Sequence, residues 1–393
     1  MNVALGHVCT FLNGGTPSTS VARYFEGSIP WITGADIVAP TVESARSFIT
    51  EEAIQNSATN RVPAGTVLLV TRTSVGKVAV AGTALCFSQD ITALIPNQQK
   101  LDTGYLVQFL HTKVPHFERL ARGATIKGIT REVVADLQVP IPPLPEQRRI
   151  AEILDRAEAL KAKRRAVLAQ LDTLTQSIFI DTFGDPAMNP KGWPVMALGD
   201  VVREKPNNGI FRKNPEYEQD DTKGIPVVWV EELFRGSSID TKESRRVVPT
   251  KAEASKYGLH YGDVLFCRSS LKLDGIAFNN VYFGQDNAAL FECHLIRVQP
   301  NMSIVSPIYL NCLLRLPQMR AIAKSKSKTA TMTTIDQTAL CSIPVMLPLF
   351  ALQQEFARRV SALEKLKAAH RASLAEMDAL FASLQHRAFR GKL

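Results

Sequence analysis

The chain lacks the sequence patterns that mark several large classes of protein. Its six cysteines are scattered and form no C-x-x-C pair, which argues against a disulfide framework or a zinc site and favours buried thiols in a reducing cytosol. The seven histidines show no H-E-x-x-H or other ligand spacing, and Cys293 and His294 would point to opposite faces of a strand. The start of the chain has no signal-peptide pattern, and a long uncharged run, 337–354, contains two prolines. We therefore expect a cytoplasmic protein with no disulfide, no metal and no membrane span.

Motifs of nucleotide-using and DNA-modifying enzymes are also missing. The string SVGK (74–77) lacks the G-x-x-x-x-G-K-[ST] spacing of a phosphate-binding loop. Adenine methylation would need a glycine-rich cofactor loop and an N-P-P-[FY]-like tetrapeptide, and the nearest strings, GDPA (184–187) and MNPK (188–191), do not fit. No P-D…E-x-K nuclease pattern occurs either. The chain is therefore expected to be non-catalytic and to hold no cofactor of its own.

The charge balance permits a polyanionic partner without requiring one. Lysine and arginine number 46 against 37 acidic residues, a formal net charge of +9, and the excess is spread along the chain. Any basic surface must therefore be assembled by folding.

The feature that the chain does have is an internal repeat. VPIPPLPEQRRIAEIL (139–154) and PVMLPLFALQQEFARRV (344–360) each lead into a long charged helix. A shift of 206 residues places Gln147 on Gln353, and it holds over some forty residues. A chain repeated in this way presents two similar surfaces and suits a target made of two parts.

Each proline-rich run precedes a helix with an apolar seam. From Pro145 the apolar residues step by alternating 3 and 4, and Gly184-Asp185-Pro186 ends the pattern. Forty residues at 1.5 Å each would reach about 60 Å, and such a stripe needs a partner. We expect the two helices to pair antiparallel through Ala157, Leu160, Val167, Leu171, Leu174 and Ile178 of the first and Leu363, Leu366, Leu374, Met377, Leu380 and Leu384 of the second.

The segments before the helices indicate two related α+β domains. Residues 61–82 indicate strands joined by tight turns, and 105–121 has helical spacing interrupted at Pro115. A shift of 196 places Ile29-Pro30 on Ile225-Pro226 and Arg72 on Arg268. We therefore predict an α+β fold with a pseudo-two-fold repeat, made of a first domain (1–144), a central helix (145–184), a second domain (185–349) and a C-terminal helix (350–393).

With these features, the chain resembles the specificity subunit of type I restriction–modification systems over essentially its full length. The motifs that carry the resemblance are LGHVCTFLNGGTP (5–17), IPWITGADI (29–37), GATIKGIT (123–130), PPLPEQRRIAEIL (142–154) and PLFALQQEFA (348–357). The second half departs from them in IPVVWVEEL (225–233) and in TATMTTID (329–336), which lacks the second glycine.

The resemblance implies a division of labour among subunits. Each globular domain would be a target recognition domain that reads one half of a bipartite, asymmetric site in double-stranded DNA, and the paired helices would fix the spacer and dock two modification subunits. Those subunits would carry S-adenosylmethionine and methylate adenine N6, whereas restriction subunits would supply a motor and nuclease that use ATP and Mg. The alternative is a protein-binding coiled-coil scaffold, whose binding would be indifferent to DNA sequence and only weakly dependent on salt.

Candidate DNA-contacting residues are polar side chains near the ends of apolar strands and before the proline-rich runs. Arginine can fork onto guanine O6 and N7, whereas hydroxyls and lysines usually contact phosphate. A solvated surface position is the alternative for each, and the basic group Lys161, Lys163, Arg164 and Arg165 is expected at the surface or in subunit docking. The candidates are Thr33, Arg72, Thr73, Ser74, Lys77, Thr125, Lys127, Arg212, Lys213, Arg268, Ser269, Ser270, Lys272, Arg320, Lys324, Lys326, Lys328 and Thr331.

Overall fold

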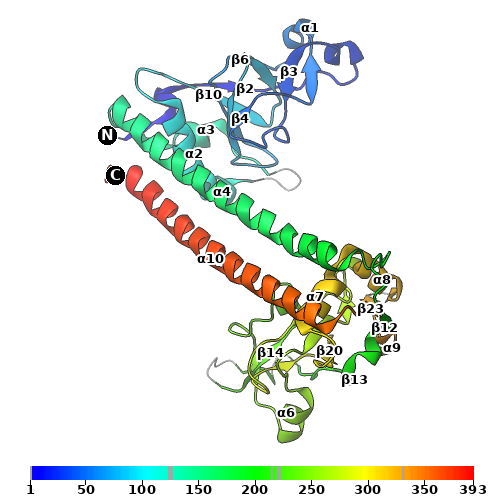
Figure 1. Cartoon of the computed structure of the whole chain (residues 1–393). Coiled ribbons are helices and arrows are strands. Elements are labelled where there is room, and N and C mark those ends of the chain that lie inside the picture. Colours follow the sequence, from blue (N-terminus) through cyan, green and yellow to red (C-terminus); the bar gives the residue numbers. More distant parts are fainter. Residues whose placement is uncertain (1, 123–126, 214–215, 219–222, 330–331) are drawn as a thin grey trace. The chain divides into compact units, whose positions relative to one another are not determined.

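A computed structural model describes residues 2–122, 127–213, 216–218, 223–329 and 332–393. The chain divides into two compact units (Figure 1). The first unit contains Met1–Arg165 and Ser373–Leu393, and the second contains Ala166–Ala372. Each unit combines a head of mixed strands and helices with parts of the two long helices, so the predicted α+β fold with an internal repeat is confirmed. Within the described residues, no helix has an apolar stretch long enough to cross a membrane.

The head of the first unit is built on small sheets. The five-stranded sheet has the order β2-β10-β7-β8-β4, with β2 (Cys9–Asn13), β4 (Thr41–Val42), β7 (Val67–Val70), β8 (Val78–Ala81) and β10 (Ile91–Pro96). The four-stranded sheet has the order β5-β3-β9-β6, with β3 (Ile29–Ile32), β5 (Ser47–Ile49), β6 (Arg61–Val62) and β9 (Leu85–Phe87). A two-stranded sheet pairs β1 (Asn2–Ala4) with β11 (Gln138–Pro140). The run VLLV forms β7 and is buried at every position, as expected of a β-branched and apolar strand at the centre of a sheet.

Among the described residues of this head, the α-helices are α1 (Glu51–Gln55), α2 (Thr103–Leu120) and α3 (Arg131–Ala135). Helix α2 begins at Asp102, whose carboxylate accepts a hydrogen bond from the Tyr105 amide at 3.1 Å. It continues through Pro115, so the predicted interruption is wrong. Proline removes a single backbone hydrogen bond, and the buried residues Phe109 and Phe117 hold the helix against the core on both sides of it.

The head of the second unit repeats this plan. Its main sheet has the order β13-β20-β16-β18, with β13 (Val202–Asn208), β16 (Val264–Cys267), β18 (Asn279–Val281) and β20 (Leu295–Pro300). Further strands are β12 (Val195–Ala197), β14 (Ile225–Val228), β15 (Arg246–Val247), β17 (Ser269–Ser270), β19 (Leu290–Phe291), β21 (Lys328–Thr329), β22 (Thr333–Thr334) and β23 (Pro344–Met346). The helices are α5 (Val230–Leu233), α6 (Lys251–Tyr257), α7 (Pro307–Arg315), α8 (Pro317–Ser325) and α9 (Gln337–Cys341). Short 3-10 helices occur in both heads at Leu5–His7, Ala22–Phe25, Leu198–Asp200 and Leu273–Gly275.

Strand pairing shows how the two heads correspond. Strands β3 and β9 run parallel, with Trp31 opposite Cys86, and strands β14 and β19 run parallel, with Val227 opposite Leu290. Both pairs therefore occupy the same place in the framework. The predicted match of Ile29-Pro30 with Ile225-Pro226 is confirmed.

After this strand pair, the residue shift that relates the two heads increases by one. The Thr71 amide donates to the Asp90 carbonyl at 2.8 Å, and the Arg268 amide donates to the His294 carbonyl at 2.7 Å. Arg268 therefore takes the place of Thr71, and the predicted match of Arg72 with Arg268 is wrong. The shift of 196 residues holds at β3 and β14, but the second head contains one more residue between β14 and β16 than the first head contains between β3 and β7.

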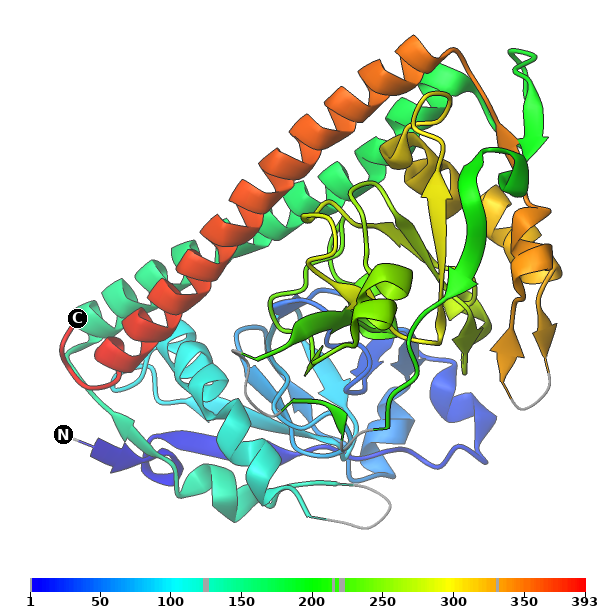
Figure 2. The same ribbon diagram turned by 90° about the horizontal axis from the view of Figure 1, so that it is seen from below.

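The two long helices, α4 (Leu144–Phe183) and α10 (Phe350–Ala388), pack antiparallel in each unit. In the first unit the start of α4 lies beside the end of α10 (Figures 1 and 2), and Lys161 Nζ is 2.8 Å from Asp378 Oδ1. In the second unit Lys367 Nζ is 3.1 Å from Asp172 Oδ1. Both lysines and both aspartates are related by the shift of 206, so the same ion pair occurs twice with the roles of the helices exchanged. This exchange is the pseudo-two-fold symmetry of the chain at the level of single side chains.

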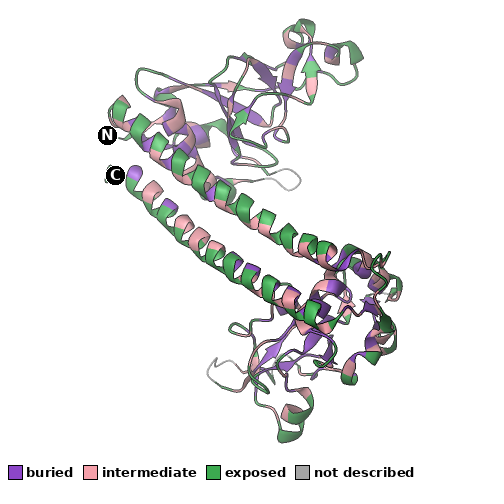
Figure 3. Ribbon diagram, viewed as in Figure 1, coloured by how far each residue is buried: buried purple, intermediate pink, exposed green. Residues whose placement is uncertain are grey.

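The packed helix face differs from the predicted seam. Leu154, Lys161, Leu363, Lys367 and Phe381 are buried, and Ala157, Leu171, Ile178, Leu374, Met377 and Leu384 are half-buried. Exposed stretches recur along both long helices (Figure 3). The predicted pairing of Leu160, Val167, Leu174, Leu366 and Leu380 is wrong, because these side chains are 37–60% exposed. The lysines replace them, since an aliphatic stem can pack in the seam while its ammonium reaches an aspartate on the facing helix.

A buried glutamine fixes each head to its long helix. Gln147 Oε1 accepts from the Asp102 amide at 2.8 Å, and its Nε2 donates to the Lys100 and Pro142 carbonyls, both at 2.8 Å. Gln353 makes the same three kinds of bond in the second unit, at 2.9, 3.2 and 2.9 Å. Both side chains are fully buried, so the repeated glutamine of the sequence marks a joint between head and helix.

The far end of each helix is anchored by an aromatic residue. In the first unit the ring of Phe389, just beyond α10, lies 5.1 Å from the ring of Tyr105. In the second unit the ring of Phe183, at the end of α4, lies 4.9 Å from the ring of Tyr309. The head of each unit therefore packs against the beginning of one long helix and the end of the other.

Candidate nucleic-acid interface

In the first head, four candidates lie in the connection between β7 and β8. Arg72, Thr73, Ser74 and Lys77 are all exposed there. The Thr73 amide donates to the Lys127 carbonyl at 3.0 Å, which brings Lys127 beside this turn. Thr73 has a φ of +66°, a conformation that is costly for a β-branched residue and that is often found at functional sites. The turn therefore brings five first-head candidates together at one exposed polar surface, whereas the candidate Thr125 lies outside the described residues.

Two of the first-head candidates also hold the neighbouring loop together. The amide and hydroxyl of Thr33 both donate to Asp36 Oδ2 at 2.8 Å, and Arg46 Nε donates to Asp36 Oδ1 at 2.7 Å. Burial alone would raise the pKa of Asp36, but these hydrogen bonds outweigh it and lower the pKa to about 2. Lys77 Nζ donates to the carbonyls of Gly34 and Ile37 at 3.3 and 3.4 Å. Thr33 and Lys77 thus have structural partners in addition to any role in DNA contact.

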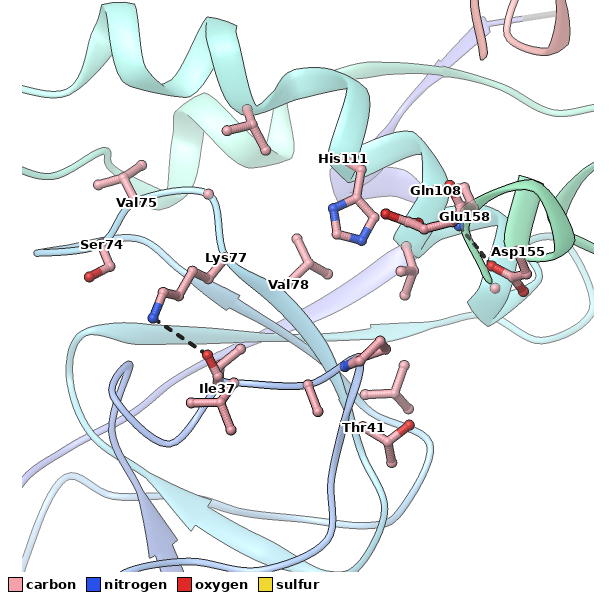
Figure 4. A pocket seen from close by; sticks show the side chains of 18 of the residues that line it. Ile37, Thr41, Ser74, Val75, Lys77, Val78, Gln108, His111, Asp155 and Glu158 are labelled. Atoms are coloured by element: carbon pink, nitrogen blue, oxygen red, sulfur yellow. Dashed lines mark hydrogen bonds between the residues drawn. The ribbon is translucent and has the colours of Figure 1, made fainter. Parts of the chain in front are cut away.

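Beside this turn lies a groove of about 1210 Å³ (Figure 4). Lys77 and Ser74 lie on one side of it, and His111 and Glu158 lie on the other. Burial lowers the pKa of His111, although the nearby carboxylates of Glu158 and Asp155 act in the opposite direction. The carboxylates of Glu158 and Asp155 make this wall acidic, so phosphate would be repelled from it and attracted to the exposed turn at the rim of the groove.

In the second head, the candidates fall into exposed, paired and buried groups. Lys213, Lys272 and Lys328 are exposed, and Lys328 Nζ lies 4.0 Å from Asp336. Lys326, Ser269 and Ser270 are half-buried, and the two serines form β17, which pairs with β22. Thr331 lies outside the described residues.

Three basic candidates of the second head have internal partners. Arg212 is half-buried and lies 2.7 Å from Glu253, and Lys324 pairs with Asp274 at 2.5 Å. Arg320 is 9% exposed, donates to the Asp274 carbonyl at 2.7 Å and lies 5.6 Å above the ring of Phe278. The structure thus contradicts a DNA contact by Arg320. The first part of the basic run lies in helix α8, which turns Arg320 inward.

Arg268 is exposed and has a different kind of partner. With its amide oxygen turned toward Arg268, Asn208 accepts from Nη1 at 2.9 Å and from Nε at 3.3 Å. In this orientation Asn208 Nδ2 lies 2.9 Å from the Gln337 amide, which accepts from it when Gln337 also turns its amide oxygen toward Asn208. The list of candidates from the sequence missed both amides. The dipeptide Asn208-Gly209, which matches Asn13-Gly14, was the available signal.

One turn of the second head brings together a carboxylate, a thiol and an imidazole. Glu292, Cys293 and His294 place one possible ligand atom each within 4.8 Å of the others, and Glu292 Oε2 accepts from His294 Nδ1 at 2.7 Å. The expected opposite orientation of Cys293 and His294 is wrong, because the residues form a turn rather than a strand. Three neighbours in one tight turn are close by necessity, so the absence of a metal stays a prediction.

Comparisons with known proteins agree with this arrangement. A family model for the type I restriction modification DNA specificity domain matches residues 1–170 and 190–377, once for each head. The type I restriction enzyme MjaIX specificity subunit of Methanocaldococcus jannaschii is 25% identical over 336 residues, which cover 80% of this chain and 76% of that one. The EcoR124I/EcoR124II specificity subunit of Escherichia coli is 33% identical over 163 residues, 40% of each chain.

Solved structures share the fold over the whole chain. A type I restriction–modification S subunit from M. genitalium covers 99% of this chain and 96% of its own at 15% identity, with a TM-score of 0.58. A chain from a structural study of assembly and conformational transition in a type I system covers 100% and 98% at 17% identity, with a TM-score of 0.60. The two domain matches, together with similarity to a specificity subunit over four-fifths of the chain, show that this protein belongs to the DNA specificity family of type I restriction–modification systems, in which its role is DNA recognition.

Proposed function

We propose that each head reads one half of a bipartite, asymmetric site in double-stranded DNA. The observation that carries this proposal is that the two heads share a framework but present different side chains at matched positions. Thr71 and Arg268 make the same backbone hydrogen bonds, yet one side chain is buried and the other is an exposed cation. A repeated frame with divergent polar surfaces suits two readers of different sequences, whereas a scaffold would have no reason to vary them.

The long helices would set the unread spacer and dock the catalytic partners. Helices α4 and α10 each contribute residues to both units. Leu160 and Leu380 are 56% and 60% exposed in the first unit, and Leu366 and Leu174 are 47% and 41% exposed in the second. Apolar side chains repeated at equivalent places suit two copies of one partner. We propose that two modification subunits bind there.

Catalysis would reside in those partner chains. The modification subunits would carry S-adenosylmethionine and methylate adenine N6 on a base flipped out of the duplex, and restriction subunits would use ATP and Mg. This chain would hold no cofactor and would act in the cytoplasm, where the chromosome is accessible.

The test is a genome-wide map of N6-methyladenine in cells that express this chain with the modification subunit of its own host. We expect a bipartite methylated motif that is absent when either subunit is expressed alone. Replacing residues 185–349 with the corresponding segment of another specificity subunit should change only one half of the motif.

Two outcomes would contradict the proposal. Methylation by this chain alone would place catalysis here. A stable complex that binds DNA without sequence preference and with little dependence on salt would instead favour the protein scaffold.

A further inference from the structure

We infer that Arg268 reads a guanine in the half-site of the second head and that Asn208 and Gln337 hold its guanidinium in position. This inference rests on the proposed function, because it assigns one base contact within a half-site. Arginine that reaches the major-groove edge of guanine can donate to both O6 and N7, and this contact distinguishes guanine from the other bases.

The backbone at Arg268 belongs to the shared framework. Its carbonyl accepts from the Ile335 amide at 2.9 Å, as the Thr71 carbonyl accepts from the Ile129 amide at 2.9 Å. A side chain at such a position is held at a defined place relative to the sheet, so a substitution changes the chemistry without moving the frame. Thr71 is 5% exposed, whereas Arg268 projects from the surface.

The partners of Arg268 leave its charge available. Asn208 contacts Nη1 and Nε, and within the described parts of the chain no contact is made to Nη2. The outer edge formed by Nη1 and Nη2 therefore retains donors for two acceptors. The partners are neutral amides, in contrast to the carboxylate of Glu253 that pairs with Arg212 at 2.7 Å. An exposed arginine that neutral groups orient is prepared for an external acceptor.

The first head places its cation on a different element. Asn13 occupies the position of Asn208, since Asn13 lies opposite Thr92 and Asn208 lies opposite Ile296 at equivalent points of their sheets. Arg131, the first residue of α3, takes the place of Gln337, the first residue of α9. Its guanidinium lies 5.5 Å above the ring of Phe11. The arginine therefore follows a strand in the second head (Arg268), whereas it begins a helix in the first head (Arg131). This difference is expected of surfaces that read different bases.

The experiment measures methylation by the complete complex with its modification subunit on duplexes that carry the cognate site or one of its single-base variants. Arg268→Ala should reduce the preference for one guanine in one half-site by roughly 5- to 150-fold, while the other half-site keeps its preferences. Arg268→Lys keeps the charge but loses the fork, so it should show nearly the same loss. Asn208→Ala should weaken the same preference by a smaller factor. Arg235→Ala, which removes an exposed arginine paired with Glu231 and Glu243, is the matched control and should change nothing.

Two results would overturn the inference. If Arg268→Lys methylates like the unmodified chain, or if Arg268→Ala lowers methylation equally on every variant duplex, the contact is to phosphate and not to a base. Failure of the proposed function looks different, because the unmodified complex would then show no bipartite motif at all.

Discussion

Replacing Gln147 with leucine should loosen the joint between the first head and α4. Leucine has a similar volume, so the packing survives while three hydrogen bonds of 2.8 Å are lost. The Asp102 amide and the carbonyls of Lys100 and Pro142 would then face an apolar side chain in a site that is fully buried. The substitution therefore tests whether this joint depends on polar pairing.

The expected cost follows from those three groups. A buried donor or acceptor left without a partner costs about 1–3 kcal/mol, and small movements that admit water bring each group toward the lower end. We therefore expect the opening free energy of the joint to fall by about 3 kcal/mol. Since about 1.4 kcal/mol is a factor of ten, amide exchange there should accelerate by roughly 100-fold.

Hydrogen–deuterium exchange of the full chain, read by mass spectrometry, localises the effect. Peptides from the start of α2 and from β11 should exchange faster, and those of the second head should not change. Gln98→Leu is the matched control, because Gln98 is exposed and makes one hydrogen bond of 3.0 Å to Thr103, so it should change the free energy by less than about 0.5 kcal/mol. Gln353→Leu should move the effect to the second unit.

Unchanged exchange at the joint after Gln147→Leu would refute the reasoning. Faster exchange spread evenly over both units would refute it as well, since the three bonds belong to one unit.

Three further predictions concern the helix pair and the first head. Asp378→Asn should lower the thermal midpoint of unfolding more than Asp172→Asn, because Lys367, which faces Asp172, keeps Glu364 as a partner at 2.9 Å. Equal effects would show that the Glu364 carboxylate is irrelevant. The pKa of Asp36 is lowered to about 2 from 3.8, so its carboxylate stabilises the first head above pH 4 and this contribution is lost as the pH falls toward 2. Asp36→Asn should therefore lower the free energy of unfolding by about 1 kcal/mol at pH 7 after solvent screening. In urea unfolding, the difference in stability between the variant and the unmodified chain should shrink in acid. A difference that stays constant with pH would show that the charge is unimportant. Leu160→Glu should change the free energy of unfolding by less than about 0.5 kcal/mol but should weaken co-purification with the modification subunit. Leu154→Glu places a charge at a fully buried position, so it should unfold the helix pair, which circular dichroism would detect as lost helix signal. Similar effects of the two substitutions would favour the seam predicted from the sequence.

The repeat and the long helices could be predicted from the sequence because they depend on local spacing. The face of the helices could not, since steps of 3 and 4 fit a seam through Leu160 as well as one through Lys161. Apolarity favoured the leucine, and the aspartate that accommodates Lys161 lies at Asp378, more than 200 residues away. The choice was decided by tertiary pairing, which periodicity does not encode.

The candidate interface was predictable only in part, for a similar reason. Exposed polar residues after an apolar strand, such as Arg72 and Arg268, follow from local pattern. The amides that orient Arg268 come from β13 and α9, and no spacing rule connects them. A basic run suggests a solvated face, so the sequence predicts an exposed Arg320. Helix geometry instead turns Arg320 toward the core.

The way in which the C-terminal end of α10 completes the first unit has a consequence for synthesis on the ribosome. Phe381, Ala388 and Phe389 pack into the core of the first unit with Tyr105, yet they emerge about 200 residues after Arg165. At 5–20 residues per second, this head waits roughly 10–40 s for its last contacts. The second unit is continuous from Ala166 to Ala372 and can close first. The half of the protein that is made first is therefore finished last, and a chain cut short in the part of α10 after Ala372 would release a complete second reader beside an unfinished first one.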